Sequence, residues 1–130
     1  MASIVELRDM SDEEIAKSLE NAREEMFNLR FQNAAARLED VSRIKTVRRD
    51  IAQYQTVLHM RQRAIQEAAK KPELLEALKD KAWSAEARFS YEDSQWVVSF
   101  VDEDGKDLAE SRVDLNKKKT GSRKTRRAAR

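Results

Sequence analysis

Two apolar series, each spaced alternately by four and three residues, constrain the fold of this chain most strongly. The first series comprises Ile15, Leu19, Ala22, Met26 and Leu29, and the second comprises Ile44, Val47, Ile51, Tyr54 and Leu58. This spacing gathers each series along one side of an α-helix, as in a coiled coil. Because only a short segment interrupts the pattern, near residues 37–42, the two helices are predicted to pack as antiparallel neighbours.

Local signals place the ends of these helices. Ser11 and Glu14 have the spacing of a capping box at the start of the first helix, and Asp40 or Ser42 can cap the second. Towards the far end of the first helix, Phe27 and Phe31 are expected to widen its apolar face. In such a hairpin each helix buries only one apolar series. The free energy gained from this burial barely offsets the conformational entropy lost on folding, so we expect the hairpin to need a partner.

The pattern changes after the second helix. Pro72 is suited to the first turn of a third helix, whose apolar face we expect to continue to about residues 83–87. Alternating apolar residues then follow around Phe89 and around Val98, and Asp104-Gly105 is a hairpin-turn signal before a weaker strand at 108–113. We therefore predict a mainly α protein: a two-helix hairpin (1–69), an extension with a short helix and a two- or three-stranded β-hairpin or meander (70–116), and a disordered basic tail (117–130).

Composition narrows the functional classes. The chain has no cysteine, which excludes disulfides and thiolate metal sites, and it has no apolar run long enough to cross a membrane. Its only histidine, His59, is expected to lie on a helix surface, and no glycine-rich phosphate loop or nucleophile motif is present. The acidic turn around Asp104 lacks the ligand spacing of a calcium loop. We predict a cytoplasmic protein that is not an enzyme and has no cofactor or metal.

Charge is segregated along the chain. Residues 1–116 carry 18 basic and 24 acidic side chains, whereas residues 117–130 carry eight basic side chains and no acid. Within the second helix, four cations lie within two turns, with Asp50 as the nearest acid: Arg43, Lys45, Arg48 and Arg49, here called the basic stripe. A solvated helix face would explain this stripe, but the local lack of acids favours an RNA or another polyanion as its partner.

Three sequence blocks resemble one known family. Residues 7–15, residues 25–32 (Glu-Met-Phe-Asn-Leu-Arg-Phe-Gln) and residues 43–52, followed by Thr56-Val57-Leu58, resemble the bacterial large-subunit ribosomal protein family numbered twenty-nine. The resemblance covers about half of the chain. The loop departs from the family pattern, because Ala34-Ala35-Ala36 stands where glycine is usual, and Tyr54 replaces an aliphatic residue.

The resemblance implies a helical hairpin bound to large-subunit ribosomal RNA near the polypeptide exit tunnel. It also implies contact with a neighbouring protein at the tunnel exit, where nascent-chain chaperones or targeting factors dock. The residues that it implies as RNA-facing are Arg30, Gln32, Arg43, Arg48, Arg49 and Thr56, to which the stripe adds Lys45.

The basic tail and the aromatic residues of the extension leave alternatives open. Unstructured basic segments bind RNA through phosphates with little sequence preference, although this run also resembles a nuclear-localisation signal. The tail residues expected to bind RNA are Lys117, Lys118, Lys119, Arg123, Lys124, Arg126 and Arg127. The aromatic residues Phe89, Tyr91, Trp96 and Phe100 could stack on bases, but we favour a small core beneath the β element.

Two other functions compete with a ribosomal role. The chain could be a coiled-coil adaptor between proteins, with the basic stripe merely solvated. It could instead be a free RNA chaperone that acts through the basic tail.

Overall fold

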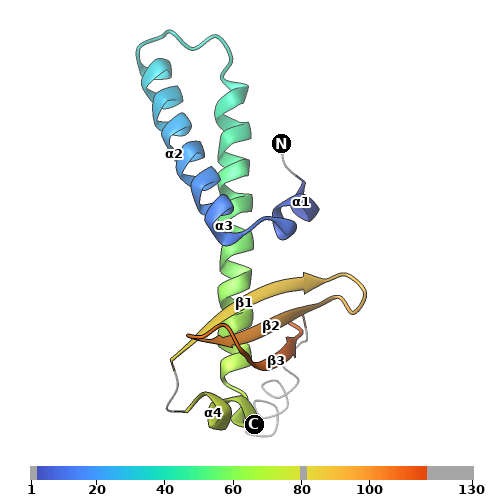
Figure 1. Ribbon diagram of the computed structural model, residues 1–130. Helices are drawn as coiled ribbons and strands as arrows, with labels where there is room; N and C mark the ends of the chain where they lie inside the picture. The colour runs from blue at the N-terminus through green and yellow to red at the C-terminus, as the bar shows by residue number, and fades with distance from the viewer. Residues whose placement is uncertain (1–2, 80–81, 117–130) are drawn as a thin grey trace, which may run out of the picture.

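The computed structural model describes residues 3–79 and 82–116. In it, one end of a helical hairpin packs against a small sheet (Figure 1). The helices α2 and α3 run side by side, and the sheet crosses the half of α3 that lies beyond the end of α2. In chain order the elements are α1 (Ile4–Asp9), α2 (Asp12–Ala34), α3 (Ser42–Ala69), α4 (Pro72–Leu78), β1 (Trp83–Ser90), β2 (Gln95–Asp102) and β3 (Asp107–Val113).

The predicted start of α2 is confirmed by its hydrogen bonds. The Glu14 backbone N–H donates to Ser11 Oγ over 3.3 Å, and the Ser11 N–H donates to Glu14 Oε2 over 3.0 Å. An equivalent capping box between Ser3 and Glu6 begins α1, a short helix that the sequence analysis did not predict. The two boxes satisfy backbone donors that would otherwise lack partners at the helix starts.

The predicted antiparallel pairing of the two long helices is also present. Ala22 and Met26 of α2 form a buried cluster with Val47 of α3, and Ile51 packs against it. Nearer the sheet, Leu7 and Ile15 form a second cluster with Val57. The helix α1 therefore adds a third element to the base of the hairpin, which supplies part of the extra burial that two helices alone would lack.

Phe27 and Phe31 do not take part in this packing. Each is 70% exposed, so the expectation that they widen the buried face of the first helix is wrong. They lie one turn apart on a side of α2 that neither α3 nor the sheet covers. The buried side is the narrower one marked by Ala22 and Met26, as in a coiled-coil contact.

The loop at the hairpin tip closes α2 in a Schellman motif without glycine. The Arg37 N–H donates to the Gln32 carbonyl oxygen over 2.9 Å, and the Ala36 N–H donates to the Asn33 carbonyl oxygen over 3.1 Å. Ala36 takes a φ of 55°, the left-handed conformation for which glycine is usual at this position. The turn therefore closes without the glycine that the resemblance led us to expect, and local backbone strain at Ala36 is the cost.

The extension folds as a three-stranded antiparallel meander in the order β1-β2-β3. Its second turn contains Gly105 with a φ of 82°, as the Asp-Gly pair predicted. The expectation that the third helix continues to residues 83–87 is wrong, because α4 ends at Leu78 and β1 begins at Trp83. Pairing with β2, in which Ala87 faces Val98, holds this alanine-containing segment extended against its helical propensity.

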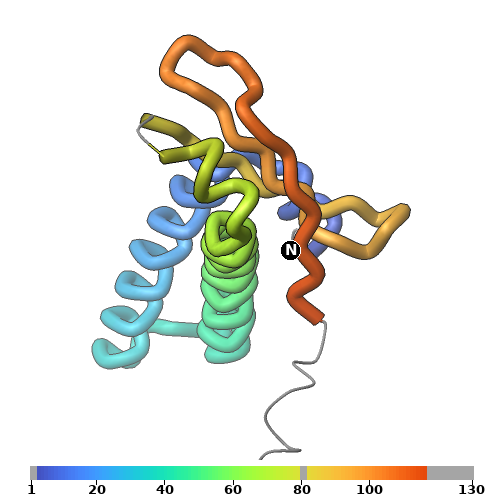
Figure 2. Tube along the Cα trace, turned by 90° about the horizontal axis from the view of Figure 1, so that it is seen from below, coloured from blue at the N-terminus to red at the C-terminus, as the bar shows by residue number. Residues whose placement is uncertain are grey.

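The core of the sheet includes the end of the hairpin. Trp96, Val98 and Phe100 of β2 are buried in one cluster with Ala64 and Ala68 of α3. Figure 2, which looks nearly along α3, shows the strands on one side of this helix and α2 on the other. Leu74 and Leu78 of α4 belong to the same cluster, so the core spans the proposed boundary at residues 69 and 70, and α3 is packed along most of its length.

Candidate nucleic-acid interface

One side of α3 carries exposed polar groups along its whole middle section. Residues spaced alternately by four and three along this side are all exposed: Lys45, Arg49, Ala52, Thr56, His59 and Arg63. Arg48, one turn after Lys45, is exposed beside them. The cations of this surface are here called the outer basic row: Lys45, Arg48, Arg49 and Arg63. From Lys45 to Arg63 the row spans about 27 Å at 1.5 Å per residue, comparable with several phosphate spacings of a nucleic acid.

The outer basic row is not neutralised by acids of its own chain. Within residues 3–79 and 82–116, none of its four cations forms an ion pair. Asp50, the only acid between Lys45 and Arg63, is two positions after Arg48 and therefore lies on another side of the helix. The row can therefore offer its charges to an external anion without first breaking an internal contact.

Arg43 differs from the rest of the basic stripe. Its guanidinium donates to Glu25 Oε1 of α2 from Nε over 2.8 Å and from Nη2 over 2.6 Å. Arg43 therefore reaches across to the neighbouring helix, whereas Lys45, Arg48 and Arg49 form no ion pair within the described residues. Its side chain is still 58% exposed, so it can be shared with a phosphate, but part of its charge is already compensated.

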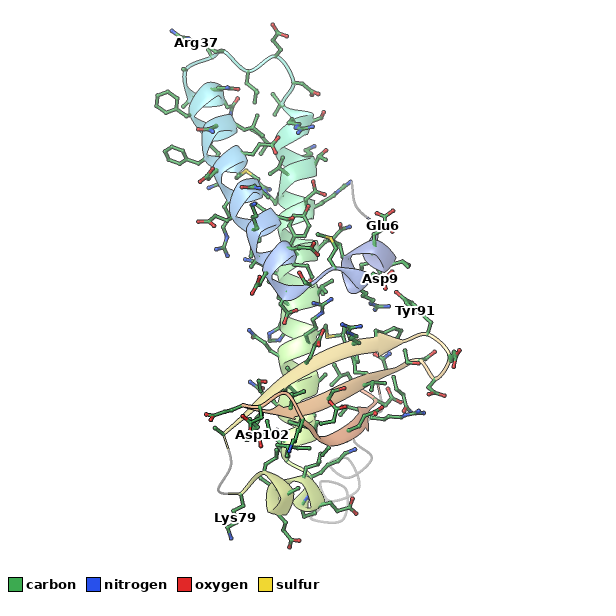
Figure 3. The ribbon with its side chains drawn as sticks, in the orientation of Figure 1. Glu6, Asp9, Arg37, Lys79, Tyr91 and Asp102 are labelled. Atoms are coloured by element: carbon green, nitrogen blue, oxygen red, sulfur yellow. The ribbon has the colours of Figure 1, made fainter. Side chains whose placement is uncertain are left out.

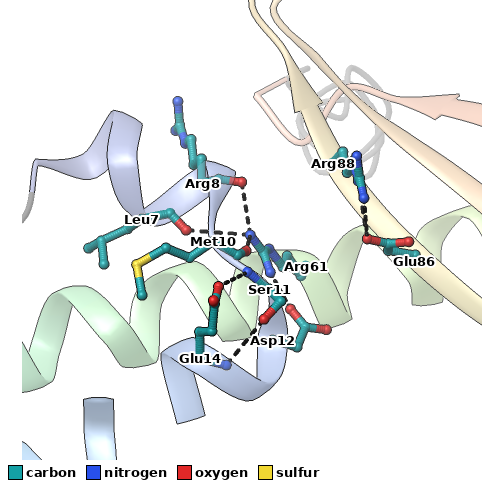
Figure 4. A network of polar contacts seen from close by, with 9 residues as sticks. All are labelled: Leu7, Arg8, Met10, Ser11, Asp12, Glu14, Arg61, Glu86 and Arg88. Atoms are coloured by element: carbon teal, nitrogen blue, oxygen red, sulfur yellow. Dashed lines mark hydrogen bonds and ion pairs between the residues drawn. The ribbon is translucent and has the colours of Figure 1, made fainter. Parts of the chain in front are cut away.

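Arg61, a further cation of α3, is buried inside the molecule. Its side chain is 7% exposed and pairs with the Asp12 carboxylate. Its Nη2 donates to the carbonyl oxygens of Arg8 over 2.9 Å and Met10 over 2.7 Å, at the end of α1 (Figure 4). A cation at a helix C-terminus satisfies carbonyl groups that have no partner within the helix. Arg61 therefore joins α3 to the α1–α2 junction and is not available to a ligand.

The other predicted site residues fall on different surfaces. Arg30 and Gln32 are exposed on α2, and Thr56 is exposed on α3, where its hydroxyl donates to the Ala52 carbonyl oxygen over 2.7 Å. The tail residues predicted to bind RNA, all between Lys117 and Arg127, lie outside the described residues. The structure thus brings Lys45, Arg48, Arg49 and Thr56 onto one side of α3, with Arg30 and Gln32 on the other helix.

Two members of this surface were not among the predicted RNA-facing residues. Arg63 continues the outer basic row beyond the third sequence block, and His59 lies between it and Thr56. His59 follows Thr56 by three residues and Arg63 follows His59 by four, so helical periodicity alone could have found both. What sequence could not show was that Arg61, two positions away, points inward.

The aromatic residues of the extension form a core and an internal cation–π contact. Trp96 and Phe100 are buried, in agreement with the small core that was favoured over base stacking. Phe89 packs edge-to-face on Trp96, with 5.3 Å between the ring centroids. The Arg8 guanidinium lies 4.1 Å from the centroid of the Phe89 ring. This contact joins α1 to the sheet and covers the face of the Phe89 ring on which a base would have to stack.

Other kinds of site find little support in the described part of the chain. There, no group of three or more histidine, aspartate or glutamate side chains is arranged to hold a metal ion. The helices of this part all fall short of the apolar length that a bilayer crossing requires.

Comparison with known proteins identifies the hairpin. Residues 5–61 match the family described as ribosomal L29 protein. The large ribosomal subunit protein uL29 of Streptomyces griseus is 48% identical over 61 residues, which cover 47% of this chain and 82% of the relative. The corresponding protein of Corynebacterium kroppenstedtii is 48% identical over 63 residues, covering 48% of this chain and 83% of the relative. The corresponding protein of Mycobacterium tuberculosis is 49% identical over 57 residues, which cover 44% of this chain and 74% of the relative.

The matched segment comprises α1, α2 and α3 as far as Arg61, and so includes the capping box at Ser11, the hairpin tip and most of the outer basic row. The sheet and α4 lie beyond it. On the strength of this match to most of the length of its relatives, the chain belongs to the ribosomal L29 protein family.

Proposed function

We propose that this chain, a structural constituent of the large ribosomal subunit, binds large-subunit ribosomal RNA near the polypeptide exit tunnel through the outer basic row. The family is structural, which agrees with the prediction that the chain is not an enzyme. The observation that carries the proposal is a row of four exposed cations on one helix, none of them paired with an acid within the described residues. Arginine side chains suit this role because guanidinium binds phosphate oxygens in a bidentate manner.

The rigidity of α3 supports RNA binding through this row. Contacts with α2, α1 and the sheet hold the helix along its length, and the Arg61 contacts fix its middle. Cations on a braced helix lose less conformational entropy on binding than cations on a flexible segment. Phosphate contacts of this kind position a protein on RNA and account for much of its affinity, while RNA shape and bases supply specificity.

Further parts of the chain complete the proposed assembly. Arg30, Gln32 and Thr56 would add polar contacts, and the basic tail would anchor the acidic extension back onto RNA. Residues 70–116 carry 12 acidic and seven basic side chains, so this region would face solvent or a protein. Neighbouring large-subunit proteins at the tunnel exit, and the chaperones or targeting factors that dock there, are the protein partners that we propose.

Charge reversal tests the proposed RNA surface. In the full chain, Arg43→Glu, Arg48→Glu and Arg49→Glu together should abolish incorporation into the large subunit, with helicity by circular dichroism nearly unchanged. Sedimentation of ribosomal particles at low and high salt measures incorporation. A matched control reverses exposed arginines on the sheet, Arg88→Glu and Arg112→Glu, and should incorporate normally.

Three outcomes would contradict the proposal. Normal incorporation of the triple variant would remove the RNA-facing assignment of the stripe. Recovery of the unaltered chain in the soluble fraction, away from ribosomal particles, would favour the protein adaptor. Loss of all RNA binding after deletion of residues 117–130, with an intact hairpin, would favour a free RNA chaperone.

A further inference from the structure

Phe27 and Phe31 are the most exposed large hydrophobic side chains in the described part of the chain, at 70% each. They lie four residues apart, so their rings project from adjacent turns of α2 on the same side. Single exposed apolar residues are common on protein surfaces, but two neighbouring phenyl rings on one well-ordered helix are an apolar patch without a partner in this chain. We call Phe27 and Phe31 the phenyl pair.

The phenyl pair lies at the basic end of the hairpin. From Arg23 to Asp50 the chain carries seven basic side chains and five acids, whereas residues 12–22 carry four acids and one lysine. Arg37, which belongs to this set, extends from the loop at the hairpin tip (Figure 3). Arg23 precedes Phe27 by four residues and helps to line a shallow groove with Glu24, Phe27 and Asn28. Arg30 follows Phe27 by three residues and is exposed.

Helix geometry places Phe27 on the same side of the hairpin as Lys45, whereas Phe31 is turned a further angle of about 40° away from α3. The ion pair between Arg43 and Glu25 marks one side of the two helices. Phe27 follows Glu25 by two residues, a rotation of about 200°, and Lys45 follows Arg43 by the same rotation. Both side chains therefore leave their helices on the side opposite the ion pair. A single polyanion could therefore meet the Phe27 ring and Lys45 together.

We propose that the phenyl pair stacks on unpaired bases of large-subunit ribosomal RNA, with Arg23 and Arg30 neutralising the adjoining phosphates. This inference rests on the proposed RNA-binding function and adds a class of contact to it. Aromatic rings beside arginine side chains suit bases that are splayed out of a loop or bulge, because stacking needs a flat apolar face and the backbone needs cations. The bare rings thus select single-stranded nucleotides, whereas the outer basic row contacts phosphates of any RNA conformation.

Substitution by leucine separates stacking from general apolar contact. Phe27→Leu with Phe31→Leu keeps an apolar patch of similar size but removes the flat rings. Binding of the full chain to purified large-subunit ribosomal RNA should weaken by at least about fivefold, the lower bound for the loss of one stacked base. Since no charge is removed, the slope of log affinity against log salt should stay unchanged. Chemical probing of the RNA should show unpaired bases that become reactive when the leucine variant replaces the parent chain.

Matched controls identify the cause of any loss of RNA affinity in the leucine variant. Tyr91→Leu removes an exposed aromatic ring at the far end of β1 and should leave RNA affinity unchanged (Figure 3). Thermal unfolding of the leucine variant should match that of the parent chain, because the rings are exposed. Arg48→Ala with Arg49→Ala should instead weaken binding and lower the salt slope by about two.

The outcomes distinguish this inference from the function on which it rests. If the leucine variant binds RNA with parental affinity, stacking is overturned. If it binds RNA normally but fails to enter large-subunit particles, the phenyl pair contacts a protein and the inference is also overturned. In both cases, a loss caused by the arginine variant would still support RNA binding through α3. If neither variant weakens RNA binding, the proposed function fails as well.

Discussion

The tip and the base of the hairpin use the same residue types for opposite purposes. At the tip, Arg48 and Arg49 are exposed and unpaired with any acid in the described residues, and two phenyl rings face solvent nearby. At the base, Arg61 is buried among carbonyl groups, and Arg8 covers aromatic rings of the sheet. Arg61 and Arg8 stabilise the fold at the base, whereas Arg48 and Arg49 have no acid partner in the described residues. A buried cation whose partners all lie within the fold cannot also serve a ligand, so the exposed cations of the outer basic row are the ones suited to binding.

The largest expected effect comes from removing the buried cation at the base. Arg61→Ala should lower the free energy of unfolding by about 3 kcal/mol, because the carbonyl groups at the end of α1 lose a charged donor while remaining partly buried. Urea denaturation monitored by circular dichroism measures this change. The matched variant is Arg63→Ala, two residues further along the same helix and exposed.

These two substitutions test the comparison directly. Arg63→Ala should change stability by less than about 0.5 kcal/mol, as is usual for exposed positions, but should reduce RNA affinity and the salt slope by about one. Arg61→Ala should leave the salt slope unchanged wherever the variant is folded. Equal losses of stability from the two variants would mean that burial does not separate the arginine that stabilises the fold from the arginine that is available to RNA.

A smaller effect is expected at the hairpin tip. Ala36→Gly should raise the free energy of unfolding by roughly 0.5 to 1 kcal/mol, because glycine adopts a positive φ without the strain that a Cβ atom imposes there. The gain is limited by the greater freedom of glycine in the unfolded chain. Ala35→Gly is the control, since Ala35 has a φ of −82° and should yield no gain. Stabilisation by both substitutions would indicate that strain at Ala36 is not the cause.

The smallest effect concerns Asp40, which lies two residues before α3 begins. Val41 is the N-cap of α3 and no side chain caps the helix, so the expectation that Asp40 or Ser42 caps it is wrong. Hydrogen bonds from the Ser42 hydroxyl and then the Ser42 N–H, with the nearby charge of Arg43, hold the pKa of Asp40 below its ordinary value of 3.8. A lowered folded-state pKa means that this contact stabilises the fold above the unfolded-state pKa. The stabilisation is lost as the pH falls below about 3.8 through the lower folded-state value.

Nuclear magnetic resonance titration of the Asp40 carboxyl carbon measures this effect. The midpoint should lie below 3.8 in the parent chain and move upwards in Ser42→Ala, which removes the hydrogen bond from the Ser42 hydroxyl. Thr46→Ala, one turn further along α3, should leave the midpoint in place. An identical midpoint in the parent chain and in Ser42→Ala would show that the Ser42 hydroxyl does not hold the carboxylate.

The segment that matches the family ends before the last turns of α3. The match to ribosomal L29 ends at residue 61, but α3 continues to Ala69 and packs its last turns under the sheet. The proposed division into a hairpin, an extension and a tail remains a prediction, as do the individual RNA-facing residues. The shared core at Ala64 and Ala68 means that the extension braces the same helix that carries the outer basic row.

The sequence by itself determined the features that depend on neighbours close in the chain. The four–three spacing predicted the two long helices, the Ser11 and Glu14 pair predicted the start of α2, and Asp104-Gly105 predicted the last turn of the sheet. Helical periodicity and capping are local properties, with each partner a few residues away. The family resemblance added the ribosomal assignment from blocks of residues in the same region.

Only the tertiary structure decided which similar side chains face inward. Arg61 and Arg63 are alike in type, yet burial of Arg61 depends on carbonyl groups of α1 that are about fifty residues away in sequence. Phe27 and Met26 are adjacent apolar residues, but only Met26 meets Val47. The segment of β1 contains helix-favouring alanine and glutamate, and pairing with β2 made it a strand. Each outcome depends on a distant partner, and the energy of that contact exceeds the local preference of a few tenths to 1 kcal/mol per residue.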